Sequence, residues 1–100
     1  PKTYPIPLVT GTLFAFFRKL MLFHVLNREG ITEDRALAGK LGIPPFAVKE
    51  YKAASKRFHW AKCRQSVSLL REIDMRAKGF NNDSTSEIEL LKELIFKLMH

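Results

Sequence analysis

The sequence has little cysteine, no nucleotide-binding motif and no strand pattern. Its one cysteine, Cys63, excludes an intrachain disulfide framework, and no group of cysteines and histidines has the spacing of a zinc site. These features indicate a reducing, cytoplasmic location. Neither common glycine-rich phosphate-binding motif occurs, and neither an alternating strand pattern nor an Asn-Gly hairpin signal is found. We therefore predict an all-α chain with no sheet, no cofactor and no catalytic centre.

Length and composition are those of an ordinary small globular domain. The 100 residues allow one domain with one core, and 46% of them are hydrophobic and 27% charged. Prolines recur through residues 1–7, which predicts an extended lead-in from an upstream domain. Residues 8–100 are expected to form the helical domain itself.

The charge is basic and unevenly distributed. Seventeen Lys and Arg residues oppose ten Asp and Glu residues, which gives a net charge of +7. The acidic residues gather near the end, because residues 79–100 hold four acids and two bases. A basic balance suits nucleic acid or an acidic protein as a partner, but it determines neither fold nor function.

The longest apolar segment covers residues 8–26. Arg18, Lys19 and His24 interrupt it, and charges in the middle of a membrane span are costly, so a buried helix of a soluble protein is favoured. Its apolar residues cover most of the circumference, which predicts packing on several sides or contact with another subunit. The interface candidates on this helix are Phe14, Phe16, Arg18, Lys19 and Phe23.

Capping and turn signals predict four further helices. Thr32 is expected to cap a helix that ends at a left-handed Gly42. Prolines suit the first turn of a third helix over residues 44–58, and a fourth is predicted over residues 61–78. A loop at residues 80–83 precedes the fifth helix. Its capping box is either Ser84 with Glu87 or Ser86 with Glu89.

The apolar stripes of these helices predict the core, because such short helices depend on packing for their stability. The residues expected to be mostly buried are Leu13, Phe17, Leu20, Leu41, Phe46, Val48, Phe58, Val67, Leu70, Ile73, Leu91 and Leu94. On the fifth helix, one face is expected to carry Ile88, Leu91, Leu94, Ile95 and Leu98.

The residues with reactive side chains form no strong constellation. His59 and Cys63 are four residues apart and suit either a metal pair or a Cys-His dyad, but no third ligand is near in sequence. A surface histidine beside a packed thiol is the favoured interpretation. His24 is expected to be buried or at an interface rather than a ligand.

Residues 36–58 predict two short helices joined by a glycine turn, which has two interpretations. One is a DNA-reading helix-turn-helix, and the other is a pair of packing helices in an assembly domain. Against the first, Phe46 offers no polar group to a base edge. The outward Lys49, Lys52 and Lys56 are candidates for weak DNA contact without sequence preference.

Several segments, taken in order, resemble the C-terminal collar domain of the delta subunit of the bacterial DNA polymerase III clamp loader. The most specific is Leu41-Gly42-Ile43 with Pro45-Phe46-Ala47-Val48-Lys49, which Asp74 and Lys78-Gly79 follow. The Phe-rich residues 13–17 before it and Leu90-Leu91 after it also match. The similarity extends over nearly the whole chain.

The resemblance implies a five-helix bundle that acts as an oligomerisation module. In the family, this domain packs with the collars of the gamma/tau and delta-prime subunits. The amino-terminal portion of delta, upstream of this region, binds and opens the sliding clamp, and delta is not the ATPase. A helix-turn-helix domain of a transcription regulator is the alternative hypothesis.

Overall fold

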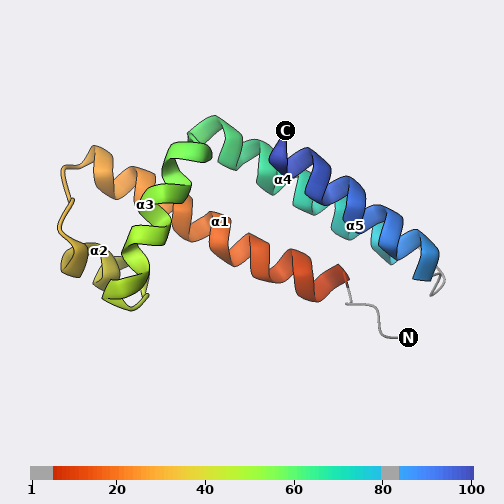
Figure 1. Cartoon of the computed structure of the whole chain (residues 1–100), viewed down its shortest axis with the longest axis horizontal. Helices are drawn as coiled ribbons and strands as arrows, with labels where there is room; N and C mark the ends of the chain where they lie inside the picture. The colour runs from red at the N-terminus through yellow and green to blue at the C-terminus, as the bar shows by residue number, and fades with distance from the viewer. Residues whose placement is uncertain (1–5, 80–83) are drawn as a thin grey trace. The chain divides into compact units, whose positions relative to one another are not determined.

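The computed structural model of the chain describes residues 6–79 and 84–100. Within them, five α-helices and one 3-10 turn follow one another, and no strand occurs (Figure 1). The elements are α1 (Ile6–Arg28), α2 (Asp34–Leu41), η1 (Pro45–Ala47), α3 (Val48–Arg57), α4 (Trp60–Lys78) and α5 (Ser84–Met99). The all-α prediction with five helices is confirmed.

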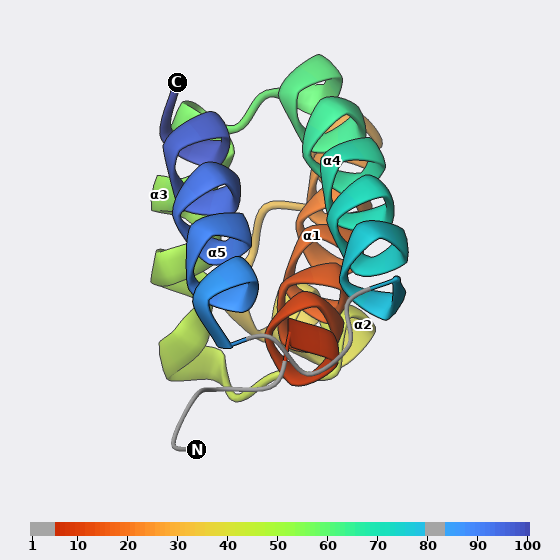
Figure 2. The same cartoon turned by 90° about the vertical axis from the view of Figure 1, so that its right-hand side faces the viewer.

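The chain divides into two units, and α1 and α4 each contribute to both. The first unit contains α1 up to Ala15, α4 from Gln65 and all of α5. These three helical segments run side by side, with α4 antiparallel to the other two (Figure 2). The core of this unit consists of fully or nearly fully buried aliphatic side chains, namely Ile6, Leu70, Ile73, Leu90, Leu94 and Leu98.

A buried polar contact joins two helices of the first unit. Thr10 is 1% exposed, and its Oγ1 lies 3.1 Å from Asp74 Oδ1 and 3.1 Å from Ile6 O. The carboxylate of Asp74 also pairs with Lys78 at 3.2 Å, one turn further along α4. The side of α4 that faces α1 is therefore fixed by a hydroxyl and a carboxylate as well as by apolar packing.

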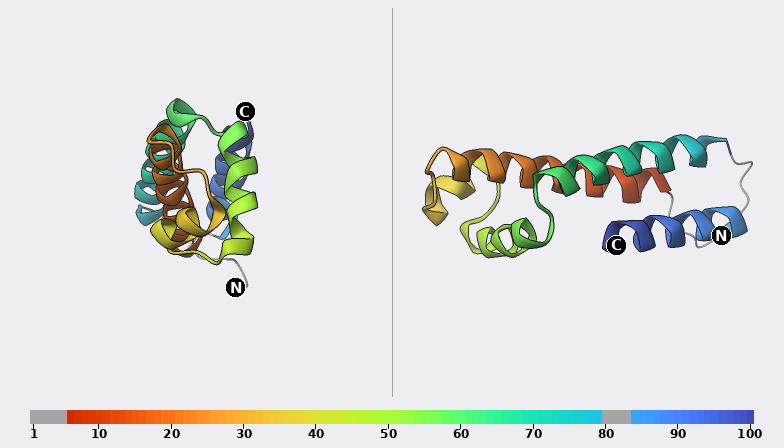
Figure 3. Two further views of the ribbon diagram at one scale, coloured as in Figure 1. Left: turned by 90° about the vertical axis from the view of Figure 1, so that its left-hand side faces the viewer. Right: turned by 90° about the horizontal axis from the view of Figure 1, so that it is seen from above.

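The second unit, Phe16–Arg64, contains the rest of α1, then α2, η1, α3 and the first turn of α4. Helix α2 ends at Gly42, whose φ of 72° lies in the left-handed region that suits glycine. Its N–H donates to Ala38 O at 2.9 Å, as predicted for a helix stop. The turn brings α2 against the beginning of α3, as Figure 3 shows on its left side.

Aromatic side chains form much of the second unit's core. Phe17 is 2% exposed, and its ring meets those of Phe16 and Phe58 edge to face, with centroids 5.3 and 5.2 Å away. Phe16 also packs on Tyr51, at 5.1 Å. Edge-to-face contacts of this kind add to the energy of burial, because the positive ring edge meets the negative ring face.

The first helix begins at Ile6, whereas the sequence analysis expected an extended segment through residue 7. α1 starts at Ile6 and includes Pro7, so the predicted boundary after residue 7 is wrong by two residues. A proline is tolerated in the first turn because its missing N–H would have had no intrahelical acceptor. Residues 1–5 lie outside the described part of the chain.

Two predictions around α2 and α3 are wrong in detail. The N-cap of α2 is Glu33 rather than Thr32, and its side chain makes no capping hydrogen bond. Phe46, expected in the core, is 75% exposed. It lies in η1, two residues before the buried Val48, and two residues correspond to more than half a helical turn. Its side chain therefore points away from the face that Val48 buries.

The buried face of α5 is rotated from the predicted one. Leu94 and Leu98 are buried as expected and Leu91 is half-buried, but Ile88 and Ile95 are 43% and 60% exposed. Leu90, which the prediction left out, is 2% exposed. The loop at residues 80–83 lies outside the described part of the chain. So do the side chains of Ser84 and Ser86, one of which each predicted capping box requires.

The ends and outer face of α4 agree closely with the sequence. The helix begins one residue before the predicted start and ends at Lys78, before Gly79. Its outer face carries two ion pairs between residues four apart: Arg76 Nη1 lies 3.3 Å from Glu72 Oε2, and Lys78 pairs with Asp74. Of the predicted core positions on this helix, Leu70 and Ile73 are fully buried and Val67 is half-buried; Cys63 is fully buried as well.

Candidate functional site

The interface candidates on α1 differ in how much surface they offer. Phe14, Phe16 and Lys19 are half-buried and Arg18 is exposed, whereas Phe23 is 1% exposed. Part of the Phe16 surface is covered by Phe17 and Tyr51. Phe23 thus belongs to the interior of the chain, and the remaining four residues could meet a partner.

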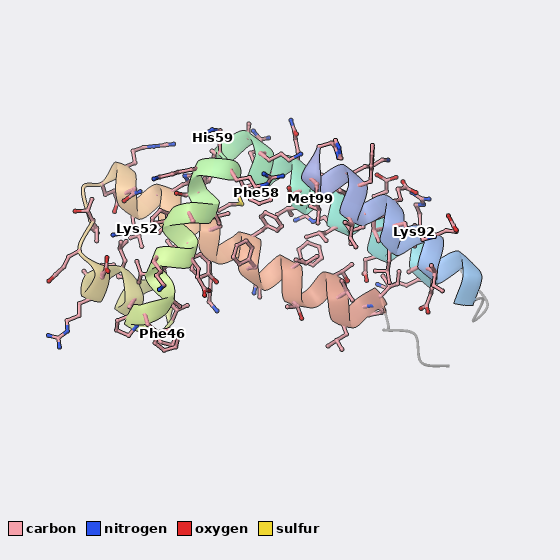
Figure 4. The ribbon with its side chains drawn as sticks, in the orientation of Figure 1. Phe46, Lys52, Phe58, His59, Lys92 and Met99 are labelled. Carbon is pink, nitrogen blue, oxygen red and sulfur yellow. The ribbon has the colours of Figure 1, made fainter. Side chains whose placement is uncertain are left out.

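A further apolar surface lies on α5, where the sequence analysis expected part of the core. We call the exposed Ile88, Ile95, Phe96 and Met99 the α5 apolar face; they are 43%, 60%, 62% and 50% exposed. Positions 88, 95 and 99 follow one another at seven and four residues, so they share one side of the helix. Lys92, four residues after Ile88 and three before Ile95, lies on the same side; Figure 4 labels Lys92 and Met99 along α5.

A charged cluster fixes the rotation of α5 against α4. Glu93 accepts hydrogen bonds from Arg76 Nη1 and Nη2, at 2.8 and 2.9 Å, and from Lys97 Nζ, at 3.0 Å. The hydrogen bonds from Arg76 and then from Lys97 lower the pKa of Glu93 to about 2. A two-pronged guanidinium contact is directional, so it favours the orientation in which Leu90 and Leu94 are buried and Ile95 is exposed.

The net positive charge of the chain lies in the second unit. Residues 16–64 hold eleven Lys and Arg residues against four acids, whereas the rest of the chain holds six of each. The whole net charge of +7 therefore lies in this segment. Lys49, Lys52 and Lys56 are all exposed on α3, as the sequence predicts, whereas Val48 and Tyr51 of the same helix are buried.

The histidines and the cysteine occupy structural positions. Cys63 is fully buried and its Sγ lies 3.4 Å from Phe58 O, and burial raises the pKa of the thiol to about 11. A thiolate nucleophile is thus disfavoured. His24 Nε2 lies 2.8 Å from the same carbonyl, and His59 is exposed. Within residues 6–79 and 84–100, no three His, Cys, Asp or Glu side chains are grouped to hold a metal ion.

Helix α1 is long and apolar enough to cross a membrane by length and composition, with a mean hydropathy of 1.5. The core helix of a soluble protein meets the same criterion. Two of its polar side chains have partners within the chain, since Thr10 contacts Asp74 and His24 contacts Phe58 O. These contacts agree with a packed helix of a soluble domain.

Comparison with known families decides between the two interpretations of the helical hairpin. Over residues 2–95, the sequence matches the family described as the C-terminal domain of the DNA polymerase III delta subunit. The chain belongs to this family. Searches of curated proteins and of solved structures each return no match.

Family membership confirms the resemblance and gives the chain its broad role. The delta C-terminal domain is a domain of a clamp-loader subunit and not a catalytic one. A delta subunit domain implies association with other subunits of the DNA polymerase III clamp loader. The transcription-regulator alternative loses its support, although α2, the Gly42 turn and α3 form a helical hairpin.

Proposed function

We propose that this delta C-terminal domain is a collar, an oligomerisation module that helps assemble the clamp loader which places the sliding clamp on DNA. The observation that carries the proposal is the family match, which extends over 94 residues, from 2 to 95. Its partners are the collars of the gamma/tau and delta-prime subunits. It contacts the sliding clamp only through the portion of delta upstream of this domain, and it works in the cytoplasm without a cofactor.

The α5 apolar face supports this role because it has the composition of an interface core. Large apolar side chains, aromatic residues and methionine are enriched at interface centres, and charged residues surround them. Ile95 and Phe96 are the most exposed members of this face. Lys92 lies on the same side, between Ile88 and Ile95, and pairs with Glu89 at 3.9 Å; these two side chains are 71% and 69% exposed. An apolar stripe on one helix suits the apolar stripe of a helix from a partner collar.

Helix α1 provides a second region for contact. Phe14 and Phe16 present partial apolar surface there, and Arg18 and Lys19 suit charged contacts at an interface rim. Phe23 is buried in the chain and therefore offers no surface to a partner. The α5 apolar face and the α1 surface lie on different helices, so the effects on binding of substitutions on each can be compared directly.

Co-purification with the gamma/tau collar, without nucleotide, tests the proposal. Ile95→Glu and Phe96→Glu each place a charge on the α5 apolar face and should lower affinity at least tenfold, since hot-spot residues contribute 2 kcal/mol or more. Arg18→Glu tests the α1 surface. Met75→Glu is the matched control because Met75 is 71% exposed on α4, and this variant should bind normally.

Circular dichroism must show that each variant is folded. If the folded native chain fails to join the gamma/tau collar at micromolar concentration, the collar proposal is wrong. If the native chain joins it but Ile95→Glu and Phe96→Glu bind as well as Met75→Glu, α5 is not at the interface. Loss of binding by Arg18→Glu alone would place the contact on α1.

A further inference from the structure

The second unit exposes an aromatic ring in the same row as its lysines. Phe46 is 75% exposed, more than any other large apolar side chain of the described residues. It precedes Lys49 by three residues, and Lys56 follows Lys49 by seven, so the three positions recur at helical spacing. Figure 4 shows Phe46 at the start of α3 and Lys52 further along it. We call Phe46, Lys49, Ala53 and Lys56 the α3 row.

Two lysines of the α3 row are available to a ligand. Lys52, beside the row, is engaged by Asp34, with Nζ 2.7 Å from Oδ1. Within the described part of the chain, neither Lys49 nor Lys56 forms an ion pair with a carboxylate. Both are exposed and lie about 10 Å apart along the helix axis, at 1.5 Å per residue. They therefore offer two separate positive charges on one side of α3.

We propose that the α3 row binds single-stranded nucleic acid, with Lys49 and Lys56 on phosphates and the ring of Phe46 stacked on a base. This activity is separate from collar assembly, which the proposal above assigns to α5 and α1. Single strands are bound by combining a positive surface with exposed aromatic rings, because every base has a face on which a ring can stack. The net charge of +7 in residues 16–64 would attract the strand.

The same row fits double-stranded DNA less well. Sequence is read in the major groove by side chains that donate to or accept from base edges, and Phe46 and Ala53 provide neither. In a duplex the base faces are already stacked on each other, so the Phe46 ring would have no partner of its own. The ring thus distinguishes the single strand from the duplex, whereas the lysines serve both.

Fluorescence anisotropy of the 100-residue chain with a labelled oligothymidine and with a random duplex tests the proposal. Two phosphate contacts on a single strand give a slope of log K against log salt of about −1.4, which is about sevenfold between 50 and 200 mM salt. Lys49→Gln with Lys56→Gln should remove this slope. Phe46→Ala should weaken oligothymidine binding about fivefold or more. Phe46→Tyr, which keeps an aromatic ring, should bind as tightly as the native chain.

The matched control combines Lys78→Gln with Lys92→Gln, which removes the same charge from exposed positions in the first unit. This control should bind like the native chain. Absence of binding at 50 mM salt, or equal loss in the control, overturns the proposal. So does a Phe46→Ala variant that binds as tightly as the native chain, or a duplex bound equally well. Displacement of the strand by polyglutamate of equal charge, independent of Phe46, would instead assign the row to an acidic protein.

Discussion

Phe17 and Phe46 allow the same substitution to be compared at a buried and at an exposed site. Phe17 is 2% exposed and has edge-to-face contacts with two rings, while Phe46 is 75% exposed. Replacing a buried phenylalanine by alanine costs about 3–5 kcal/mol, because apolar burial is lost and a cavity is left. An exposed substitution usually changes stability by no more than about 0.5 kcal/mol.

The effect of Phe17→Ala should therefore be large for a chain of this size. A domain of about 100 residues has about 5–15 kcal/mol of stability in total, so the variant would lose a third or more of it at the midpoint of these ranges. At about 4–8 °C per kcal/mol, its Tm should fall by at least about 12 °C. Phe46→Ala should change Tm by only a few degrees.

Urea denaturation, followed by Trp60 fluorescence and by circular dichroism, measures both variants. Trp60 is the chain's one tryptophan and begins α4, within the same unit as Phe17. Coincident transitions by the two probes justify two-state free energies. Equal losses for Phe17→Ala and Phe46→Ala would refute the packing described for α1 and α3. Phe17→Leu should lose less stability than Phe17→Ala, since leucine keeps most of the side-chain volume and only the ring contacts are lost.

Four further outcomes are expected. Thr10→Val should cost about 1–3 kcal/mol in urea denaturation, because a buried hydrogen bond to a carboxylate is lost; no loss would contradict that contact. Ser66→Ala should leave stability unchanged or raise it by about 1 kcal/mol, since the buried Ser66 Oγ has no hydrogen-bond partner among the described residues. In the folded state the pKa of Glu93 is lowered to about 2, so as the pH falls Glu93 takes up its proton in the unfolded state first. Stability from the Arg76 contact should thus be full above about pH 4.5 and lost towards pH 2, and Glu93→Gln should flatten this dependence; parallel pH profiles would contradict it. Iodoacetamide should label Cys63 only as fast as the chain opens, because its thiol is buried and its pKa is raised to about 11, so labelling at the rate of a free thiol in native buffer would refute its burial.

The sequence was sufficient to predict the helices and part of the core. Of the predicted core residues, seven are buried (Phe17, Leu20, Leu41, Val48, Leu70, Ile73 and Leu94), whereas Leu13, Phe58, Val67 and Leu91 are half-buried. Regular spacing of apolar residues predicts Val48 and Tyr51 on one side of α3 and the lysines on the other, and the structure agrees. Gly42 marks the end of α2 for a local reason, its left-handed φ. Such predictions succeed because they depend on neighbours within one or two turns of the chain.

The orientation of α5 could not be predicted in this way. Apolar residues are distributed round α5, so its sequence offers more than one apolar stripe. These residues are Ile88, Leu90, Leu91, Leu94, Ile95, Phe96, Leu98 and Met99. The choice between stripes depends on contacts with residues distant in sequence, such as the Arg76 contact with Glu93. Phe46 was misplaced for a local reason: it lies two residues before the buried Val48, which is more than half a helical turn.

Correcting α5 changes where an interface is expected. The sequence placed the surplus apolar surface on the first helix, where Leu8 and Leu22 are 64% and 40% exposed and Phe23 is buried; the last helix adds Ile95 and Phe96, which are 60% and 62% exposed. The unit that contains α5 has no net charge, and the unit that contains α3 carries all of it. A surface without net charge that exposes apolar side chains suits a protein partner, since apolar burial drives such association. The basic unit suits phosphates, whose contacts weaken with salt. Raising the salt concentration should therefore release a bound strand while the subunit contact through α5 persists.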